Sequence, residues 1–300
     1  MSAKKVGFVG VGLMGHGMAK NLIEKGHTLT ILGHRNRQPI DDLVSRGATE
    51  AKTPKEVAAA SDIVFLCLPT SRHVEQIVLG EDGVMEGGKD GLIVVDTSTA
   101  DPNSTIRIAA ALSTKGIRMA DAPLARTPKE AEEGRLNVMM GADAALFAEL
   151  EPVIQGFAEN IFHVGELGAG HKIKLINNFI ALGNASVIAE AVTVAAKVGV
   201  DIEKLYDLIS AGGANSNMFQ MVMPFVLKND ASSMQFAIEN AAKDLRYFAQ
   251  MTNEAKMVNP VSPAVMSAFS LAENMGNGSK FVPELCDVFA GLNKVDVHKG

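Results

Sequence analysis

The chain has 300 residues, of which 47% are hydrophobic, and its formal net charge is −6. This length exceeds what one hydrophobic core usually organises, so two domains are expected. Acidic and basic residues are mixed without a basic tract, which argues against nucleic acid or an anionic membrane as a partner. The two cysteines form no metal or disulfide pattern. No signal peptide is expected, because residues 1–5 lead directly into the first expected strand. A cytoplasmic protein without a metal site is expected.

Short β-branched runs alternate with helical segments through the first half of the chain. This alternation is typical of a doubly wound, mostly parallel sheet with helices on both faces. The sequence therefore predicts an α/β domain over residues 1–165. The expected strands are Val6–Val9, Thr28–Ile31, Asp62–Leu66, Leu92–Asp96, Ile117–Ala120, Leu136–Met140 and Ile161–Val164, and the clearest helices are Met14–Lys25 and Asn103–Lys115.

After Gly165 the strand candidates give way to long helical patterns. The first of these patterns is apolar nearly all round and needs cover on several sides. Glu190 and Lys197 interrupt its apolar run, which favours a buried helix over a membrane span. An all-helical second domain over residues 166–300, joined to the first by this long helix, is predicted. Its expected helices are Gly170–Lys197, Ile202–Ser210, Gln235–Met257 and Pro263–Asn274.

A glycine-rich segment, Gly10-Val-Gly12-Leu13-Met14-Gly15, follows the first strand and opens the first helix. In a strand–helix–strand unit this spacing is typical of a dinucleotide-binding loop. Gly10 permits the tight turn, Gly12 lets a pyrophosphate approach the backbone, and Gly15 lets helix and strand pack closely. The phosphates then meet unpaired N–H groups at the positive end of the helix. The alternative is a glycine-rich turn without a ligand.

The end of the second strand should distinguish the two nicotinamide cofactors. An acidic residue there binds the ribose 2′-hydroxyl, and an arginine accommodates a 2′-phosphate. The chain has His34, Arg35 and Arg37 at this place and no carboxylate before Asp41. Because forked guanidinium donors suit a dianionic phosphate, NADP(H) is expected to be preferred, with NAD(H) possible. The alternative is that both arginines are solvated loop charges.

A cation, Lys174, lies on the long apolar helix, and Asn178 follows one turn later on the same face. An ammonium on such a helix either reaches water or is held where its proton is used. The alternatives are a surface cation and a helix-packing amide. Together with the glycine-rich loop, the lysine indicates a dehydrogenase, in which one half of the chain binds a hydride carrier and the other supplies a proton.

Four segments resemble those of the β-hydroxyacid dehydrogenases. Gly10-x-Gly12-x-Met14-Gly15-x-x-Met18-Ala-x-Asn21-Leu22 is similar to the family's opening signature, and Asp121-Ala-Pro123 with Gly134 to its substrate-binding segment. Gly168-x-Gly170-x-x-x-Lys174-x-x-x-Asn178 resembles the catalytic segment, and Lys243-Asp244-Leu245 the cofactor-proximal one. The resemblance implies a Rossmann domain, a helical second domain, an active site between them, and a homodimer or homotetramer formed through the helical domain.

The resemblance also implies roles for single residues. Lys174 is implied to be the general acid in reduction and the general base in oxidation of a small anionic substrate, which Asn178 would hydrogen-bond. Leu68, Pro69 and Thr99 follow strand ends, where an open parallel sheet binds ligands. The resemblance implies that Thr99 and Lys243 lie near the cofactor, and that the residues lining the substrate pocket include Thr99, Phe236 and Asp244. Taken alone, Phe236 would be core and Asp244 a solvated partner of Lys243.

One departure from the family concerns the substrate. After Asp121-Ala-Pro123, where most members have a Ser-Gly-Gly turn, the chain has Leu124-Ala125-Arg126-Thr127. The Arg-Thr pair is similar to that of sulfolactaldehyde reductase, a family member, and a forked donor would suit a sulfonate. Ala125, Arg126 and Thr127 are therefore candidate substrate-binding residues. The alternative is that Arg126 points outward and Thr127 only caps a helix.

The leading interpretation is an NAD(P)-dependent oxidoreductase for a small acidic 3-hydroxy compound or its semialdehyde, of the tartronate semialdehyde or 3-hydroxyisobutyrate type. Reduction of a sulfonate aldehyde is the first alternative. Imine reduction and a non-catalytic cofactor-binding module are further alternatives, and both are disfavoured by the lysine at position 174.

Overall fold

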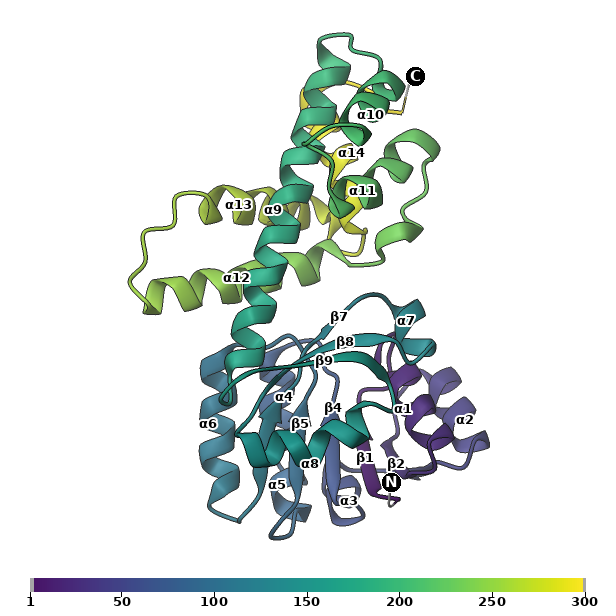
Figure 1. The fold of residues 1–300 in the computed structure, drawn as a ribbon, viewed down its shortest axis with the longest axis vertical. Coiled ribbons are helices and arrows are strands. Elements are labelled where there is room, and N and C mark those ends of the chain that lie inside the picture. The colour runs from purple at the N-terminus through teal and green to yellow at the C-terminus, as the bar shows by residue number, and fades with distance from the viewer. Residues whose placement is uncertain (1–2, 299–300) are drawn as a thin grey trace. The chain divides into compact units, whose positions relative to one another are not determined.

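The computed structural model describes residues 3–298, and the chain divides into two compact units. The first unit ends at Lys174 and the second begins at Leu175, so the division falls inside helix α9 (Ala169–Lys197). The boundary expected near Gly165 lies at the end of the last strand. Figure 1 draws the first unit in purple to teal and the second in teal to yellow.

Within residues 3–298, the first unit contains a nine-stranded sheet in the order β3-β2-β1-β4-β5-β6-β8-β7, with β9 beside β8. Neighbouring strands from β3 to β6 are parallel, β8 is antiparallel to β6 and β7, and β9 is parallel to β8. The expected doubly wound, mostly parallel sheet is confirmed. The strands are β1 (Lys5–Val9), β2 (Thr28–Leu32), β3 (Thr49–Ala51), β4 (Ile63–Leu66), β5 (Ile93–Asp96), β6 (Arg118–Asp121), β7 (Leu124–Ala125), β8 (Leu136–Gly141) and β9 (Ala158–Gly165).

Helices cover both faces of this sheet. Successive side chains of each strand point to opposite sides, and in the central strands the side chains on both sides are apolar and need cover. On one face Phe8 and Phe65 pack with α1 (Gly15–Glu24), α2 (Arg37–Ser45) and α8 (Ala144–Ile154). On the other face Val64 and Leu66 pack with the remaining helices. These are α3 (Pro54–Ala59), α4 (Ser71–Leu79), α5 (Val84–Gly87) and α6 (Pro102–Ser113). The short helix α7 (Pro128–Glu132) lies against α1.

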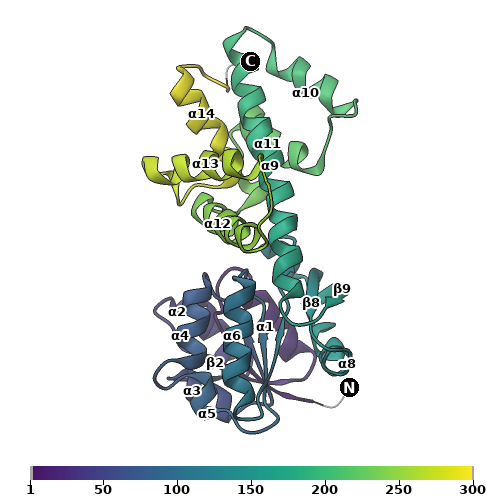
Figure 2. The ribbon, with the colours of Figure 1, turned by 90° about the vertical axis from the view of Figure 1, so that its left-hand side faces the viewer.

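The second unit is helical, as expected, and Figure 2 shows its helices gathered along α9. Small and apolar residues of α9, such as Leu182, Ala185 and Ala189, pack against Phe219 and Phe269 in its core. Two short 3₁₀ turns (Ser232–Met234 and Val282–Glu284) and a π turn (Glu273–Asn277) interrupt the helices. These helices are α10 (Ile202–Ser210), α11 (Asn217–Lys228), α12 (Ile238–Glu254), α13 (Ser262–Ala272) and α14 (Leu285–Asn293).

Helix α9 is long and apolar enough to cross a membrane, with a mean hydropathy of 1.7 in its most apolar window. Length and composition alone are weak indications, because the core helix of a helical domain has the same character. In the second unit, one face of α9 packs in the core, where Leu182, Ala185 and Ala189 are buried. Only 39% of its most apolar window is buried, so α9 is a core helix on one face and exposed on the other.

Candidate active site

The glycine-rich loop joins β1 to α1 in a conformation that explains two of its glycines. Gly10 has φ +98°, and a Cβ there would lie 2.2 Å from the carbonyl oxygen of Cys67. A Cβ on Gly15 would lie 2.0 Å from the carbonyl oxygen of Gly10. Around Gly12, by contrast, a Cβ would meet no atom within 4 Å among residues 3–298. The loop is therefore tightly packed on the protein side and open at Gly12.

The opening faces a helix end that can bind an anion. Helix α1 begins at Gly15, and its first turn carries neither a side-chain cap nor an acidic residue in the described part of the chain. The adjoining Leu13 is 70% exposed. Free N–H groups at a helix start attract phosphate, and the open space at Gly12 would admit one. The residues thus fit the dinucleotide that the sequence predicts.

The loops after β4 and β5 lie beside this loop, because β1 and β4 are neighbours in the sheet. A Cβ on Gly10 would lie 3.2 Å from the Leu68 side chain. The N–H group of Leu68 donates to Ser98 Oγ at 2.9 Å, which ties the Leu68-Pro69 segment to the segment of the half-buried Thr99. In doubly wound sheets the ligand binds where the strand order reverses, here between β1 and β4. The structure therefore brings these predicted cofactor residues together.

The end of β2 has a carboxylate that the sequence did not indicate. Glu50, on the neighbouring strand β3, accepts hydrogen bonds of 2.6 and 2.9 Å from the Arg37 guanidinium, and Asp41 accepts a third of 2.8 Å. These bonds raise the pKa of Arg37 and lower that of Glu50. Arg37 was expected to meet a 2′-phosphate, but here its charge is already balanced. His34 and Arg35 are exposed, and Arg35 forms no ion pair within residues 3–298.

Asp121 fixes the start of α9 to the sheet. Its Oδ1 accepts the N–H group of Gly168 at 2.6 Å, and its Oδ2 accepts that of His171 at 2.7 Å. A Cβ on Gly170 would lie 2.8 Å from Asp121 Oδ2 and 2.4 Å from the carbonyl oxygen of Met139, so the helix backbone packs directly on the sheet. Burial raises the pKa of Asp121, partly opposed by His171 and the two N–H groups. The carboxylate of the Asp-Ala-Pro segment therefore serves the fold.

His171 and Asp96 complete this buried cluster. Both side chains are fully buried, and His171 Nε2 lies 3.4 Å from Asp96 Oδ2. This cluster was not predicted from the sequence, because its members come from three separate elements, β5, β6 and α9. The sequence did contain a signal for this cluster: Asp121 lies in one of the family-like segments, and Gly168 and Gly170 lie in another.

Lys174 lies one turn beyond this anchored start of α9. Its side chain is half-buried, between the buried His171 and the buried Asn178 on the same helix. Lys174 is thus less exposed than an ordinary surface cation. The position is therefore compatible with proton transfer.

Asn178 belongs to a polar cluster in the second unit. Its Nδ2 donates to Asp244 Oδ2 at 2.6 Å, and Asp244 Oδ1 forms an ion pair of 3.1 Å with Lys243 Nζ. Asp244 is 2% exposed, so it is no solvated surface charge. Lys243 also lies over the Tyr247 ring at 5.6 Å. Three predicted site residues are thus joined, while Phe236 is partly buried and packs against the core of this unit.

The turn after β7 uses its side chains internally. The Arg126 guanidinium contacts Glu159 and the carbonyl oxygen of Arg135, and Thr127 and Glu130 form a capping box at the start of α7. The sequence left open whether Thr127 caps a helix, and in this structure it does. Ala125 pairs with Asn137 in the sheet. Arg126 has φ +84°, a left-handed conformation that favours the glycine usual in the family.

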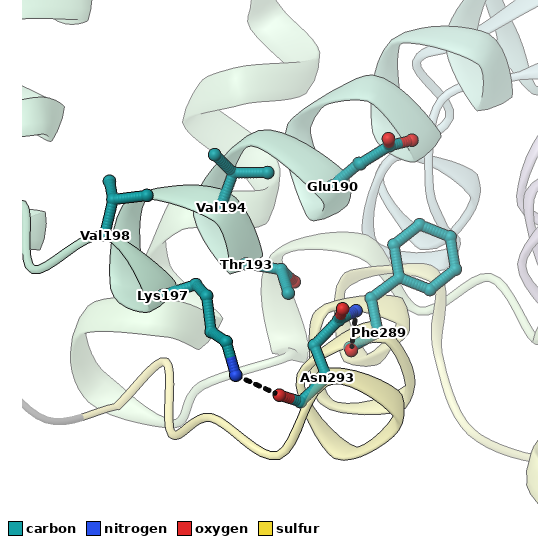
Figure 3. A pocket seen from close by; sticks show the side chains of 7 residues that line it. All are labelled: Glu190, Thr193, Val194, Lys197, Val198, Phe289 and Asn293. Carbon is teal, nitrogen blue, oxygen red and sulfur yellow. Dashed lines mark hydrogen bonds between the residues drawn. The ribbon is translucent and has the colours of Figure 1, made fainter.

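A cavity of about 180 Å³ lies away from the predicted residues, between α9 and α14 of the second unit. Figure 3 shows Glu190, Thr193 and Phe289 around it, and Lys197 Nζ donating to the carbonyl oxygen of Asn293 at 3.0 Å. Lys197, one of the charges that interrupt the apolar run of α9, thus bridges to α14.

Known families match both units. Residues 5–165 match the NAD binding domain of 6-phosphogluconate dehydrogenase, and residues 168–285 match the NAD-binding region of NADP-dependent 3-hydroxyisobutyrate dehydrogenase. The 2-(hydroxymethyl)glutarate dehydrogenase of Eubacterium barkeri is 32% identical over 297 residues, which are 99% of this chain and 98% of the relative. The 3-sulfolactaldehyde reductase of Escherichia coli (strain K12) is 29% identical over 91% of each chain.

A solved structure extends the similarity to three dimensions. The 3-hydroxyisobutyrate dehydrogenase from Salmonella typhimurium matches with a TM-score of 0.84 at 28% identity, over 95% of this chain and 99% of that one. The two family models follow each other along the chain as the two units do, and the first covers the open glycine loop. The chain is therefore an NAD(P)-binding oxidoreductase and belongs to the β-hydroxyacid dehydrogenase family.

Proposed function

We propose that the protein is an NADPH-preferring reductase or dehydrogenase for small acidic 3-hydroxy compounds and their semialdehydes, of the tartronate semialdehyde or 3-hydroxyisobutyrate type. The observation that carries this proposal is the half-buried Lys174, one turn beyond the helix start that Asp121 anchors. Arg35 supports NADPH, because its exposed guanidinium is available to a phosphate.

When bound, a nicotinamide coenzyme would supply the hydride that the carbonyl carbon of the substrate accepts in reduction. Lys174 Nζ gives its proton to the carbonyl oxygen, so that a hydroxyl forms, and in oxidation the neutral amine takes the proton back. Asn178 holds the substrate by a hydrogen bond, and its amide is itself oriented by Asp244. Gly12 and the start of α1 bind the phosphates of the dinucleotide.

A substrate panel tests the proposal. The purified protein is assayed in reduction with tartronate semialdehyde, sulfolactaldehyde and a cyclic imine, and in oxidation with 3-hydroxyisobutyrate, using NADP and then NAD coenzymes. A carboxylate substrate is expected to give the highest kcat/KM, with NADPH preferred over NADH. The proposal is wrong if the cyclic imine is turned over fastest, or if the coenzyme binds and no substrate reacts.

The sulfonate alternative predicts a selective effect at Arg126. Because Glu159 already binds this guanidinium, we expect Arg126→Ala to change kcat/KM for carboxylate and sulfonate aldehydes by the same factor, within about twofold. Arg126→Gly is the backbone control, since glycine accepts the positive φ without strain. A loss confined to the sulfonate substrate, in both variants, would instead favour sulfolactaldehyde reduction.

We further propose that the protein forms a homodimer or homotetramer through α9. An exposed apolar stripe supports this, since contiguous apolar surface marks interaction sites. It is formed by Ile176, Ile180, Val187, Val194 and Val198, which are 45%, 59%, 67%, 54% and 67% exposed.

Val187→Glu is expected to lower the mass measured by light scattering to that of a smaller assembly, with an unchanged circular dichroism spectrum. The reason is that a charge in an apolar interface is desolvated without a partner. Glu203→Gln on α10 alters an exposed side chain outside the stripe and serves as the control. A monomeric parent protein would contradict the proposal.

A further inference from the structure

At the end of β2, the carboxylate of Glu50 on the neighbouring strand β3 takes the place of the acidic residue that β2 itself lacks. Dinucleotide-binding folds that take NAD place an acidic residue about 20 residues beyond the glycine loop. Here Gly33 follows β2, and its N–H group donates to the carbonyl oxygen of Ala51 at 3.0 Å. A Cβ on Gly33 would lie 2.3 Å from Glu50 Oε1. The Glu50 carboxylate therefore occupies the space that a side chain at position 33 would take.

This carboxylate is bound to the arginine that the sequence assigns to a 2′-phosphate. Two of the three bonds that Arg37 forms with carboxylates go to Glu50. The two side chains are 49% and 34% exposed, so water screens the pair and it costs little to separate. Asp41, the third acceptor, is 64% exposed and lies one turn along α2. Arg37 is thus held by an interaction that a doubly charged phosphate can replace.

We propose that Glu50 limits how strongly the protein prefers NADP(H) over NAD(H). Its carboxylate competes with the 2′-phosphate of NADP(H) for Arg37, and with NAD(H) it stays on Arg37 and accepts a hydrogen bond from the ribose 2′-hydroxyl. Glu50 therefore narrows the NADPH preference that Arg35 supports. The inference rests on the proposed function only in requiring that a nicotinamide dinucleotide binds beside the glycine loop.

Direct binding tests the inference without a substrate. The dissociation constants of NADP⁺ and NAD⁺ are measured by calorimetry for the parent and for Glu50→Gln. In the variant we expect NADP⁺ to bind about fivefold tighter, the fold-change that corresponds to one exposed ion pair, and NAD⁺ to bind no tighter than to the parent. The gain is limited because Asp41 still faces Arg37.

Two controls identify the cause. In an Arg37→Gln background, Glu50→Gln should no longer tighten NADP⁺ binding, because the competition requires the guanidinium. Glu86→Gln removes a comparable surface ion pair, that with Lys55, and should leave both constants unchanged. Unfolding midpoints of all variants check that the fold is kept.

The other possible results would contradict either the role proposed for Glu50 or the proposed function. If the ratio of the NADP⁺ and NAD⁺ dissociation constants in Glu50→Gln stays within twofold of the ratio in the parent, Glu50 does not limit the preference. If NADP⁺ binds more weakly, Glu50 positions Arg37 for the phosphate and the competition is wrong. If neither coenzyme binds the parent protein, the proposed function fails, whereas unchanged binding of both overturns the inference alone.

Discussion

Replacing Lys174 with alanine is expected to lower kcat by about 10²–10⁴-fold, the range typical of a lost general acid or base. The Kd of NADPH should stay within about twofold, because the role proposed for the lysine is at the carbonyl oxygen of the substrate and not at a phosphate. Steady-state kinetics with the best substrate of the panel, together with calorimetric binding of NADPH, measures both quantities.

Three comparisons sharpen this experiment. Lys174→Arg keeps a cation whose pKa is too high for proton transfer at neutral pH, so its kcat should also fall. Lys172→Ala removes an exposed cation two residues away on α9 and should behave as the parent. A small primary amine in solution should partly restore kcat to Lys174→Ala. If Lys174→Ala retains a kcat within a few-fold of the parent, another group transfers the proton.

Substitutions in the glycine loop are expected to have the second large effect. Replacing Gly12 should weaken coenzyme binding, and replacing Gly15 should lower the stability of the fold. Gly12→Ala should leave the unfolding midpoint unchanged, because a Cβ there meets nothing within 4 Å among the described residues. Its coenzyme Kd should rise by more than about tenfold, equivalent to about 1.4 kcal/mol, because the methyl group would stand where the pyrophosphate is expected to approach. Calorimetric titration measures the Kd.

Gly15→Ala is expected to behave differently. Its Cβ would lie 2.0 Å from the backbone oxygen of Gly10, so the loop must shift and the free energy of unfolding should fall by about 1–3 kcal/mol. Gly213→Ala, in the second unit, also adds a Cβ that meets nothing within 4 Å in the described chain and is the matched control. Parent-like coenzyme binding by Gly12→Ala would show that the pyrophosphate does not lie at this loop.

The sequence predicts the sheet well where strands are buried on both faces. The runs Ile63–Leu66 and Ile93–Asp96, which are mostly apolar, give a clear strand pattern because every residue in them is buried. β3 and β7 were missed, since strands of three and two residues are too short to give a pattern. Helix α11 was missed as well, because Pro224 in its interior reads as a break.

The sequence predicts the site residues only where they are close together along the chain. The glycine loop and the Lys174–Asn178 spacing are local patterns, and both lie on the expected elements. Glu50 was not predictable, because its contact with Arg37 depends on the register between β2 and β3. Arg126 was not predictable for a similar reason, since its partner Glu159 comes from a distant strand.

The cap on α9 also bears on the order in which the protein assembles. Asp121 reaches Gly168 and His171 from about fifty positions earlier in the chain, so the helix receives its terminal acceptors only once β6 has taken its place. Without them the opening turns would leave buried N–H groups unsatisfied and would fray. In a half-folded chain the first turns of α9, which carry Lys174, would therefore not be ordered, and the sheet acts as the template for the start of this helix.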